Sequence, residues 1–319
     1  MPHFSRRGSD SRPVGRPAGS AGEFVAPAGA VRPRGSSLGP REAPPVAPRP
    51  AASESSPLPG SRSGPARDEL KICGLAAVRA RFARDAGSIQ RLFFDHATGQ
   101  RVGVICRVLA QAKKIYRQVE QAELEKIAGS VHHGGIVAVV APPALRAPTA
   151  DDVRSWVQRG EAVLVLDRIG NAHNLGAIAR TAAFFGVGHV VIPDHPGAAR
   201  PTDAAHRVAE GGMEHLTVWL VKDLAGFAKE LAATGFEVIG AATRGAAPLR
   251  GGERKREKGE SKPIALVVGN EEQGLAPEVA AACSRVVTIP GGGRIESLNV
   301  SVAAAVLMWE LLARRQSCA

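Results

Sequence analysis

The chain has 319 residues, of which 44% are hydrophobic and 22% charged, and its formal net charge is +11. This length is enough for two domains, and the hydrophobic fraction is enough for a sizeable core. The longest apolar run, Val300–Leu307, is far shorter than the roughly 20 residues of a membrane-spanning helix. The N-terminus lacks the apolar segment of a signal peptide, so we expect a cytoplasmic protein with no membrane contact.

The positive charge favours an acidic partner, most simply a nucleic acid. The alternative is a solvated basic surface with a basic tail. The cysteines do not occur at the Cys-x-x-Cys spacing of a zinc site, and we expect no metal. Their small number suits a reducing compartment, where they act as small hydrophobic residues. They are Cys73, Cys106, Cys283 and Cys318.

Residues 1–66 form a segment of low complexity that is rich in Pro, Gly, Ser and Arg. Thirteen of the 23 prolines of the chain lie in it. Such a composition cannot bury enough apolar surface to offset the entropy of ordering the chain. We predict a disordered basic tail, which serves either as an electrostatic tether for RNA or as a spacer.

Residues 67–142 alternate between strand and helix patterns, which indicates a small α/β domain. The expected strands cover 69–73, 89–96 and 131–143, and the expected helices cover 75–85, 100–115 and 122–129. Basic side chains of this domain form a candidate RNA-binding face, although such a run of charge is often only solvated. The residues of this candidate face are Arg79, Arg81, Arg84, Lys113, Lys114 and Arg117.

A proline-interrupted linker is expected over 143–158, and the alternating pattern returns over 159–319. Short, almost continuously apolar strands are typical of a parallel sheet that is buried on both faces. A charged loop over 251–262 is expected to be exposed. The strands are expected at 161–167, 189–194, 236–243, 264–271 and 285–291, and the helices at 175–186, 223–235, 276–284 and 298–314.

The first of three unusual segments is LDRIGNAHNLGAIARTAAFFGV, residues 166–187. It follows a strand, at the edge where parallel sheets bind ligands. Asn174 is the predicted N-cap of the helix. Arg180 lies on a helix that otherwise looks buried, and it is either a surface arginine or a contact to a phosphate, whose oxygens match its forked donors.

The second segment, ALVVGNEEQGLAPEV over 265–279, also follows an apolar strand. Gly269 and Asn270 come directly after this strand, where a glycine lets the backbone approach a ligand closely. Glu271 is either a ligand contact or a charge at the start of a helix. The third segment, IPGGGRIESLNVSVAAAVLMW over 289–309, lacks the Gly-Lys-Ser/Thr ending of a phosphate-binding P-loop. Ser297 and Asn299 stand at the start of its helix, where Ser297 is a candidate N-cap.

Together the three segments resemble motifs 1, 2 and 3 of the SpoU-type (TrmH-like) RNA 2′-O-ribose methyltransferases of the SPOUT superfamily. The matching stretches are NAHNLGAIARTA, VVGNEEQGL and IPGGGRIESLNVSVAAAV. Residues 68–142 resemble the L30e-like substrate-binding domain of this family, above all in ICGLAAV and HHGGIVAVV. The stretches HHGG and NAHNLG are most similar to the YfiF-like branch.

The resemblance implies an α/β fold in which a small L30e-like domain precedes a SPOUT methyltransferase domain with a parallel sheet and a C-terminal trefoil knot. It implies a homodimer that transfers a methyl group from S-adenosyl-L-methionine to a ribose 2′-hydroxyl in tRNA or rRNA. The implied catalytic residues are Asn174, Arg180, Glu271, Ser297 and Asn299, and the implied cofactor-binding residues are Gly269, Asn270, Ile289, Gly293 and Leu298.

There are two alternatives to this function. A non-catalytic RNA-binding protein with the same fold is the main alternative, and the retained motif residues argue against it. A Rossmann-type nucleotide enzyme would need a Gly-x-Gly-x-x-Gly turn after its first strand, and IGNAHNLG does not supply one.

Overall fold

The computed structural model describes residues 69–243, 246–249 and 262–313. Every described residue belongs to the second of the two units of the chain, which spans residues 62–319. The predicted tail over 1–66, Cys318 and nearly all of the predicted charged loop over 251–262 lie outside the described residues.

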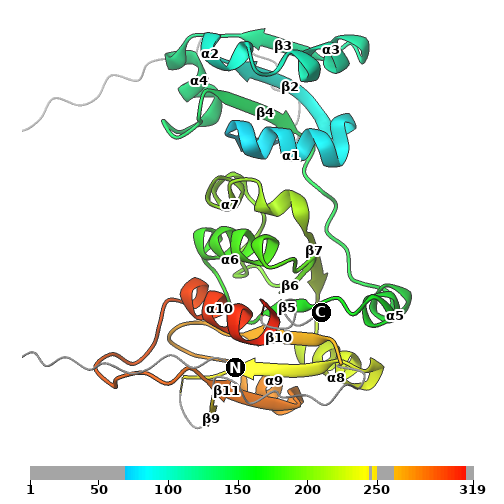
Figure 1. Ribbon diagram of the computed structural model, residues 1–319, viewed down its shortest axis with the longest axis vertical. Helices are drawn as coiled ribbons and strands as arrows, with labels where there is room; N and C mark the ends of the chain where they lie inside the picture. The colour runs from blue at the N-terminus through cyan, green and yellow to red at the C-terminus, as the bar shows by residue number, and fades with distance from the viewer. Residues whose placement is uncertain (1–68, 244–245, 250–261, 314–319) are drawn as a thin grey trace, which may run out of the picture. The chain divides into compact units, whose positions relative to one another are not determined.

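The N-terminal part of the second unit, called the small domain below, is built on a four-stranded sheet with helices (Figure 1). Its sheet has the strand order β1-β4-β2-β3, in which β4 is antiparallel to both neighbours and β3 is parallel to β2. Its strands are β1 (Leu70–Cys73), β2 (Ile89–Phe94), β3 (Ile115–Gln118) and β4 (Ile136–Val140). Its helices are α1 (Leu75–Asp85), α2 (His96–Gly99), α3 (Gly103–Gln111) and α4 (Gln121–Ala128).

Strand β4 is buried on both faces and divides the core of the small domain. Ile136, Ala138 and Val140 pack with α1 and α3, and Val137 and Val139 pack with residues of α4. The sequence missed strand β3, because all four of its side chains are exposed on an edge strand and therefore show no hydrophobic alternation.

The C-terminal half is built on one parallel sheet with the strand order β7-β6-β5-β10-β8-β11-β9. Strand β10 thus lies between β5 and β8, although it follows both in the chain. The C-terminal trefoil knot stays a prediction. The strands are β5 (Val163–Leu166), β6 (His189–Pro193), β7 (Thr217–Val221), β8 (Glu237–Ala241), β9 (Ala247–Pro248), β10 (Ile264–Val268) and β11 (Arg285–Thr288).

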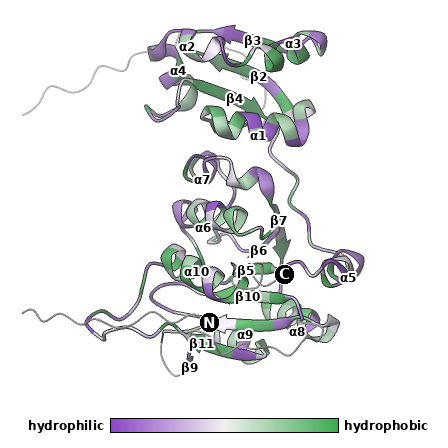
Figure 2. Cartoon of the chain, in the orientation of Figure 1, coloured by the Kyte–Doolittle hydropathy of each residue, from purple (hydrophilic) through white to green (hydrophobic). Residues whose placement is uncertain are grey.

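Both faces of this sheet are covered by helices, as the apolar strands predicted. Leu164 and Leu166 of β5 pack in a core with α6, α7 and α10, whereas Val163 and Val165 pack in a second core with α5, α8 and α9. In Figure 2 the central strands are accordingly hydrophobic along their length. The helices are α5 (Ala150–Arg159), α6 (Ala172–Phe184), α7 (Asp203–Ala209), α8 (Leu224–Thr234), α9 (Pro277–Ala282) and α10 (Val300–Met308).

Helix α5 corrects the predicted linker over 143–158. The helix begins after Thr149, whose side chain accepts a hydrogen bond from the backbone N–H of Asp152, while the Asp152 carboxylate accepts one from the backbone N–H of Thr149. Val153 and Trp156 then pack in the core below the sheet. The prolines at 142, 143 and 148 all precede this helix, so the connection between the two halves is the short segment 141–149.

Helix α7, the 3₁₀ turn η2 (Gly212–His215) and strand β7 were not predicted from the sequence. No helix of the described residues is long and apolar enough to cross a bilayer.

His189, the first residue of β6, contacts two tryptophans and a glutamate. Its ring stacks on Trp156 with the ring centroids 4.3 Å apart. Trp219 Nε1 donates a hydrogen bond to His189 Nδ1 over 3.3 Å, and His189 Nε2 lies 3.0 Å from Glu161 Oε2. An indole N–H can only donate, so Nδ1 accepts and the proton of the neutral ring is on Nε2. Burial lowers the pKa of His189, and the hydrogen bond to Glu161 opposes this effect only in part.

We therefore expect the free energy of unfolding to fall as the pH drops from 7 to 5. Because the pKa of His189 is lowered in the folded state, the unfolded chain takes up the proton first, below about pH 6.5. His189→Phe keeps an aromatic ring against Trp156 but cannot be protonated. Urea unfolding at pH 7 and pH 5 should show a smaller loss of stability in the variant, and equal losses in both proteins would contradict this assignment.

Candidate functional site

The loops after β8, β10 and β11 meet at the carboxyl edge of the parallel sheet and line a cavity of about 830 Å³. This volume lies in the usual range for small-molecule sites. The loops following β10 and β11 supply most of its lining, and Val268, Val287 and Leu307 contribute apolar walls. Seven residues predicted for the site line the cavity: Gly269, Asn270, Glu271, Ile289, Gly293, Ser297 and Leu298.

Glu271 joins all three predicted motifs through side-chain hydrogen bonds. Asn174 Nδ2 donates to Glu271 Oε1 over 2.6 Å. Asn299 Nδ2 donates to Asn174 Oδ1 over 3.1 Å and lies 3.5 Å from Glu271 Oε1. The structure therefore brings Asn174, Glu271 and Asn299 together, although they are far apart in the sequence.

Both predicted helix caps are wrong by two or three residues. Because Asn174 is not the cap of α6, its side chain can take part in this cluster. Helix α6 begins at Ala172, and its N-cap is Asn171, whose Oδ1 accepts a hydrogen bond from His173 N over 2.8 Å. Asn174 consequently lies in the first turn, with its amide directed across to Glu271. Likewise Asn299, and not Ser297, caps α10 by accepting from Ser301 N over 2.9 Å.

The loop after β10 is held in a narrow turn by its own side chain and by its backbone. Asn270 Oδ1 accepts hydrogen bonds from Glu272 N and Gln273 N over 2.9 and 3.1 Å. A side chain at Gly269 would have its Cβ only 2.4 Å from the carbonyl carbon and oxygen of Gly274. Glycine is therefore required at 269, because the two limbs of the turn touch through their backbones.

Arg168 is a structural residue of the site that the sequence did not reveal. Its backbone has a φ of 57°, the left-handed region that few side chains adopt. Its guanidinium donates to Gln273 Oε1 over 3.1 Å and to Gly274 O over 2.9 Å. The neighbouring Asp167, which is buried, accepts a hydrogen bond from Ala276 N over 2.6 Å. The charged pair directly after a buried strand was the available signal.

The structure places Arg180 outside the cavity. Six residues along an α-helix correspond to about 9 Å, and Arg180 lies that far beyond Asn174 on α6. Its Nη1 is 2.9 Å from Glu210 Oε1, and both side chains are more than half exposed. Arg180 is thus available to a large ligand that approaches the site from outside.

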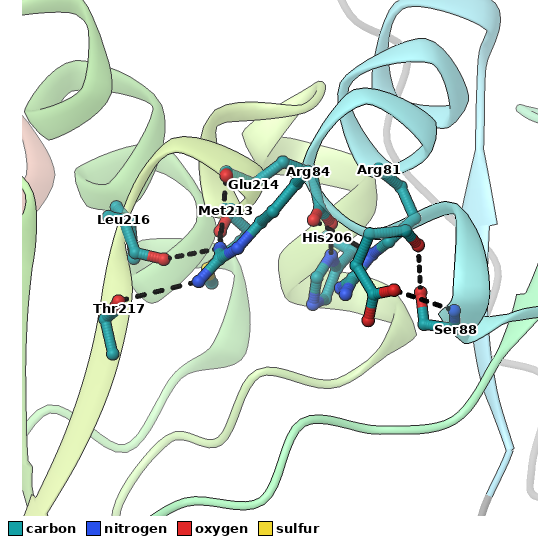
Figure 3. Close-up of polar contacts among 9 residues, drawn as sticks. Arg81, Arg84, Ser88, His206, Met213, Glu214, Leu216 and Thr217 are labelled. Atoms are coloured by element: carbon teal, nitrogen blue, oxygen red, sulfur yellow. Dashed lines mark hydrogen bonds and ion pairs between the residues drawn. The ribbon is translucent and has the colours of Figure 1, made fainter.

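One residue of the predicted RNA-binding face is in the wrong environment for that role. Arg81 is 6% exposed and its Nε lies 2.9 Å from Glu214 Oε2, so it cannot belong to an exposed basic face (Figure 3). Arg79 and Lys113 are exposed as expected. Lys114 is half-buried and donates to the carbonyl oxygen of Gly87.

The described residues contain no cluster of His, Cys, Asp or Glu that could hold a metal ion. Cys73, Cys106 and Cys283 are free thiols, and burial raises the pKa of each, that of Cys283 to about 11. These thiols are therefore protonated and act as small apolar side chains, as predicted.

Known protein families match both halves of the second unit. The model of the SpoU rRNA Methylase family matches residues 161–309. The model for RNA 2′-O ribose methyltransferase substrate binding matches residues 71–145. The chain is 33% identical over 245 residues to the 23S rRNA (guanosine-2′-O-)-methyltransferase RlmB of Ralstonia nicotianae, covering 76% of this chain and 95% of that relative.

The chain belongs to the SpoU rRNA methylase family. It is also 30% identical over 246 residues to the uncharacterized tRNA/rRNA methyltransferase YfiF of Escherichia coli O157:H7, over 76% of this chain and 68% of that protein. The fold agrees with the AdoMet-bound rRNA methyltransferase of Sinorhizobium meliloti. That similarity has a TM-score of 0.61 at 23% identity and covers 78% of this chain and 87% of the other.

Substitution of Gly269 tests whether this cavity binds the cofactor of the family. In Gly269→Ala the new Cβ would collide with the backbone of Gly274 and Leu275, and the turn cannot yield easily because Arg168 holds it. We expect S-adenosylhomocysteine to bind at least about tenfold more weakly, a loss of ~1.4 kcal/mol, in calorimetric titration. Gly188→Ala is the matched control because its Cβ meets nothing within 4 Å. Equal affinity in both variants would contradict the assignment.

Proposed function

We propose that this member of the SpoU family transfers a methyl group from S-adenosyl-L-methionine to a ribose 2′-hydroxyl in tRNA or rRNA. The observation that carries the proposal is the ring of side chains formed by Asn174, Glu271 and Asn299 beside a cavity of about 830 Å³. A cytoplasmic location belongs to the proposal, because tRNA and rRNA are made and used there in bacteria.

The lining of the cavity fits S-adenosyl-L-methionine. The cofactor combines an adenine ring, which needs apolar walls, with ribose and amino-acid groups that need hydrogen bonds. Ile289, Leu298 and Leu307 supply apolar surface. The glycines from 291 to 293 also line the cavity and leave their backbone accessible, since a Cβ at any of them would meet nothing within 4 Å. When bound, the cofactor supplies an electrophilic methyl group.

The residues outside the cavity are suited to hold RNA beside it. A ribose hydroxyl is a poor nucleophile at neutral pH and needs alignment and activation. Arg180 stays protonated and is a poor general base, but its forked donors suit a phosphate of the target nucleotide. Arg180 Nη1 would stay paired with Glu210, and the other guanidinium nitrogens would bind that phosphate and hold the nucleotide, so that the hydroxyl proton passes to a phosphate oxygen or to water.

Glu271 and its two amide partners have a different part in the proposal. Asn174 and Asn299 fix the Glu271 carboxylate at the rim of the cavity, where it can accept a hydrogen bond from a ribose hydroxyl. Ser297 lines the same rim from the loop after β11. These residues would orient the ribose, and Arg180 would orient the phosphate.

The proposal includes a homodimer that forms through α6 and α10. Phe184 at the end of α6 is 82% exposed, and Trp309 directly after α10 is 53% exposed. Val306 lies one turn before Trp309 on α10 and Val302 lies two turns before it, and both add exposed apolar surface. Exposed apolar residues gathered in one region typically mark an interface, and α6 packs directly against α10. A second copy of this chain would cover this region.

The test is transfer of labelled methyl from S-adenosyl-L-methionine to bulk tRNA and, separately, to rRNA from cells that lack this gene. We expect label in one pool, recovered as 2′-O-methylated nucleoside after digestion. Arg180→Ala should slow transfer by on the order of 100-fold without weakening cofactor binding, since Arg180 lies outside the cavity. Arg154→Ala, which removes an exposed arginine of α5, should transfer at the wild-type rate.

Full activity in Arg180→Ala would contradict the role of that residue. Cofactor binding without label in either pool would favour the non-catalytic RNA-binding protein. Light scattering on the same preparation tests the dimer, and the mass of a single chain would contradict it.

A further inference from the structure

A buried charged cluster joins helix α1 to the segment that contains α7 and η2 (Figure 3). Arg81 comes from α1, His206 from α7 and Glu214 from η2, and none of the three is more than 6% exposed. Glu214 Oε2 lies 2.9 Å from Arg81 Nε, and Glu214 Oε1 lies 3.4 Å from His206 Nδ1. A buried carboxylate is tolerated only when it is paired, so Glu214 depends on Arg81.

A second arginine of α1 fixes the same segment through its backbone. Arg84 Nη1 donates to the carbonyl oxygens of Met213 and Glu214 over 3.1 Å each and to that of Leu216 over 2.7 Å (Figure 3). A Cβ at Gly211 would lie 3.2 Å from Ala77 Cα, so the turn also touches the backbone of α1. These contacts specify one position of the turn against α1.

The same turn touches α6 at Arg180. A Cβ at Gly212 would lie 2.7 Å from Arg180 Cα and 3.1 Å from Ala179 O, which shows that the two backbones are in direct contact. Two residues earlier, Glu210 has a φ of 45° and its carboxylate pairs with the Arg180 guanidinium over 2.9 Å. The segment 210–214 thus contacts α1 through Glu214 and Arg180 through Glu210.

We propose that the turn 210–214 positions Arg180 according to the docking of the small domain, with Arg81 and Glu210 as positioning residues for methyl transfer. The inference rests on the proposed function. Removal of Arg81 leaves Glu214 as a buried carboxylate without the cation that pairs with it, so the turn must shift or admit water. Because the backbone of Gly212 touches that of Arg180, a shift of the turn also moves Arg180. Glu210 forms an exposed ion pair that contributes little to stability, so its main effect is on the direction of the guanidinium.

The experiment separates positioning from RNA binding by single-turnover methylation, with the full chain in excess over the RNA pool that the wild type labels. The maximal rate reports the alignment of the bound nucleotide, and the half-saturating protein concentration reports RNA binding. Arg81→Leu and Glu210→Gln should each lower the maximal rate by about tenfold, as misalignment of reacting groups does, with unchanged half-saturation and unchanged affinity for S-adenosylhomocysteine.

Two comparisons distinguish this effect from a general loss of structure. Arg81→Lys keeps a cation beside Glu214 and should recover most of the maximal rate. Arg154→Leu removes an exposed arginine of α5 and should match the wild type in rate and half-saturation. If Arg81→Leu shows no cooperative unfolding transition, that variant is not folded. Glu210→Gln then tests the inference alone, because the exposed side chain of Glu210 is not needed for folding.

A wild-type maximal rate in Glu210→Gln, or in a folded Arg81→Leu, would overturn the inference. A change in half-saturation without a change in rate would also overturn it, since the small domain would then only hold RNA. Absence of transfer by the wild type would instead overturn the proposed function itself, together with this inference.

Discussion

The site depends on the Glu271 carboxylate, which accepts hydrogen bonds from amides of two other loops. The three loops leave the sheet from different strands, and strand pairing fixes only their starting points. Hydrogen bonds to a charged acceptor are stronger than those between neutral groups. The carboxylate of Glu271 is therefore well suited to hold Asn174 and Asn299 beside each other. This closure gives the cavity its rim, and the parallel sheet below it supplies the apolar floor.

Close backbone contacts make this region stiff. A Cβ at Gly176 would lie 2.4 Å from the carbonyl oxygen of Ala205, and Gly269 and Gly212 show similar contacts with their neighbours. Helix α6 is therefore held by glycine contacts against α7 and η2 on one side, while its first turn reaches the cavity rim. Because well-packed elements transmit small shifts, a displacement of η2 is expected to reach Arg180 through its contact with α6.

Local sequence patterns were sufficient for most of the fold. Apolar strands such as 163–166 and 264–268 were predicted because they are buried on both faces, and strand β3 was missed because its side chains are exposed. Helix α5 carries a readable signal in Thr149 and Asp152, but nearby prolines favoured a linker. The cap of α6 was misplaced because NAHN offers two asparagines that suit an N-cap equally well.

The remaining errors come from partners that are distant in the sequence. Arg81 looks like any other arginine on a basic helix, and its partner Glu214 lies more than a hundred residues away. Arg168 contacts Gln273 and Gly274 across a similar separation. No local pattern shows which distant residue such a side chain contacts. The resemblance of three motifs identified Asn174, Glu271 and Asn299 as site residues, and the structure shows their mutual contacts.

Hydrogen exchange of the full chain with and without S-adenosyl-L-methionine tests the central claim most directly. If the cavity at the carboxyl edge holds the cofactor, its addition should slow amide exchange in residues 268–275 and 287–299, which include the loops that line the cavity. Exchange in the small domain, residues 70–140, should stay unchanged. Cofactor binding that protects other segments and leaves these two loops unaffected would contradict the account.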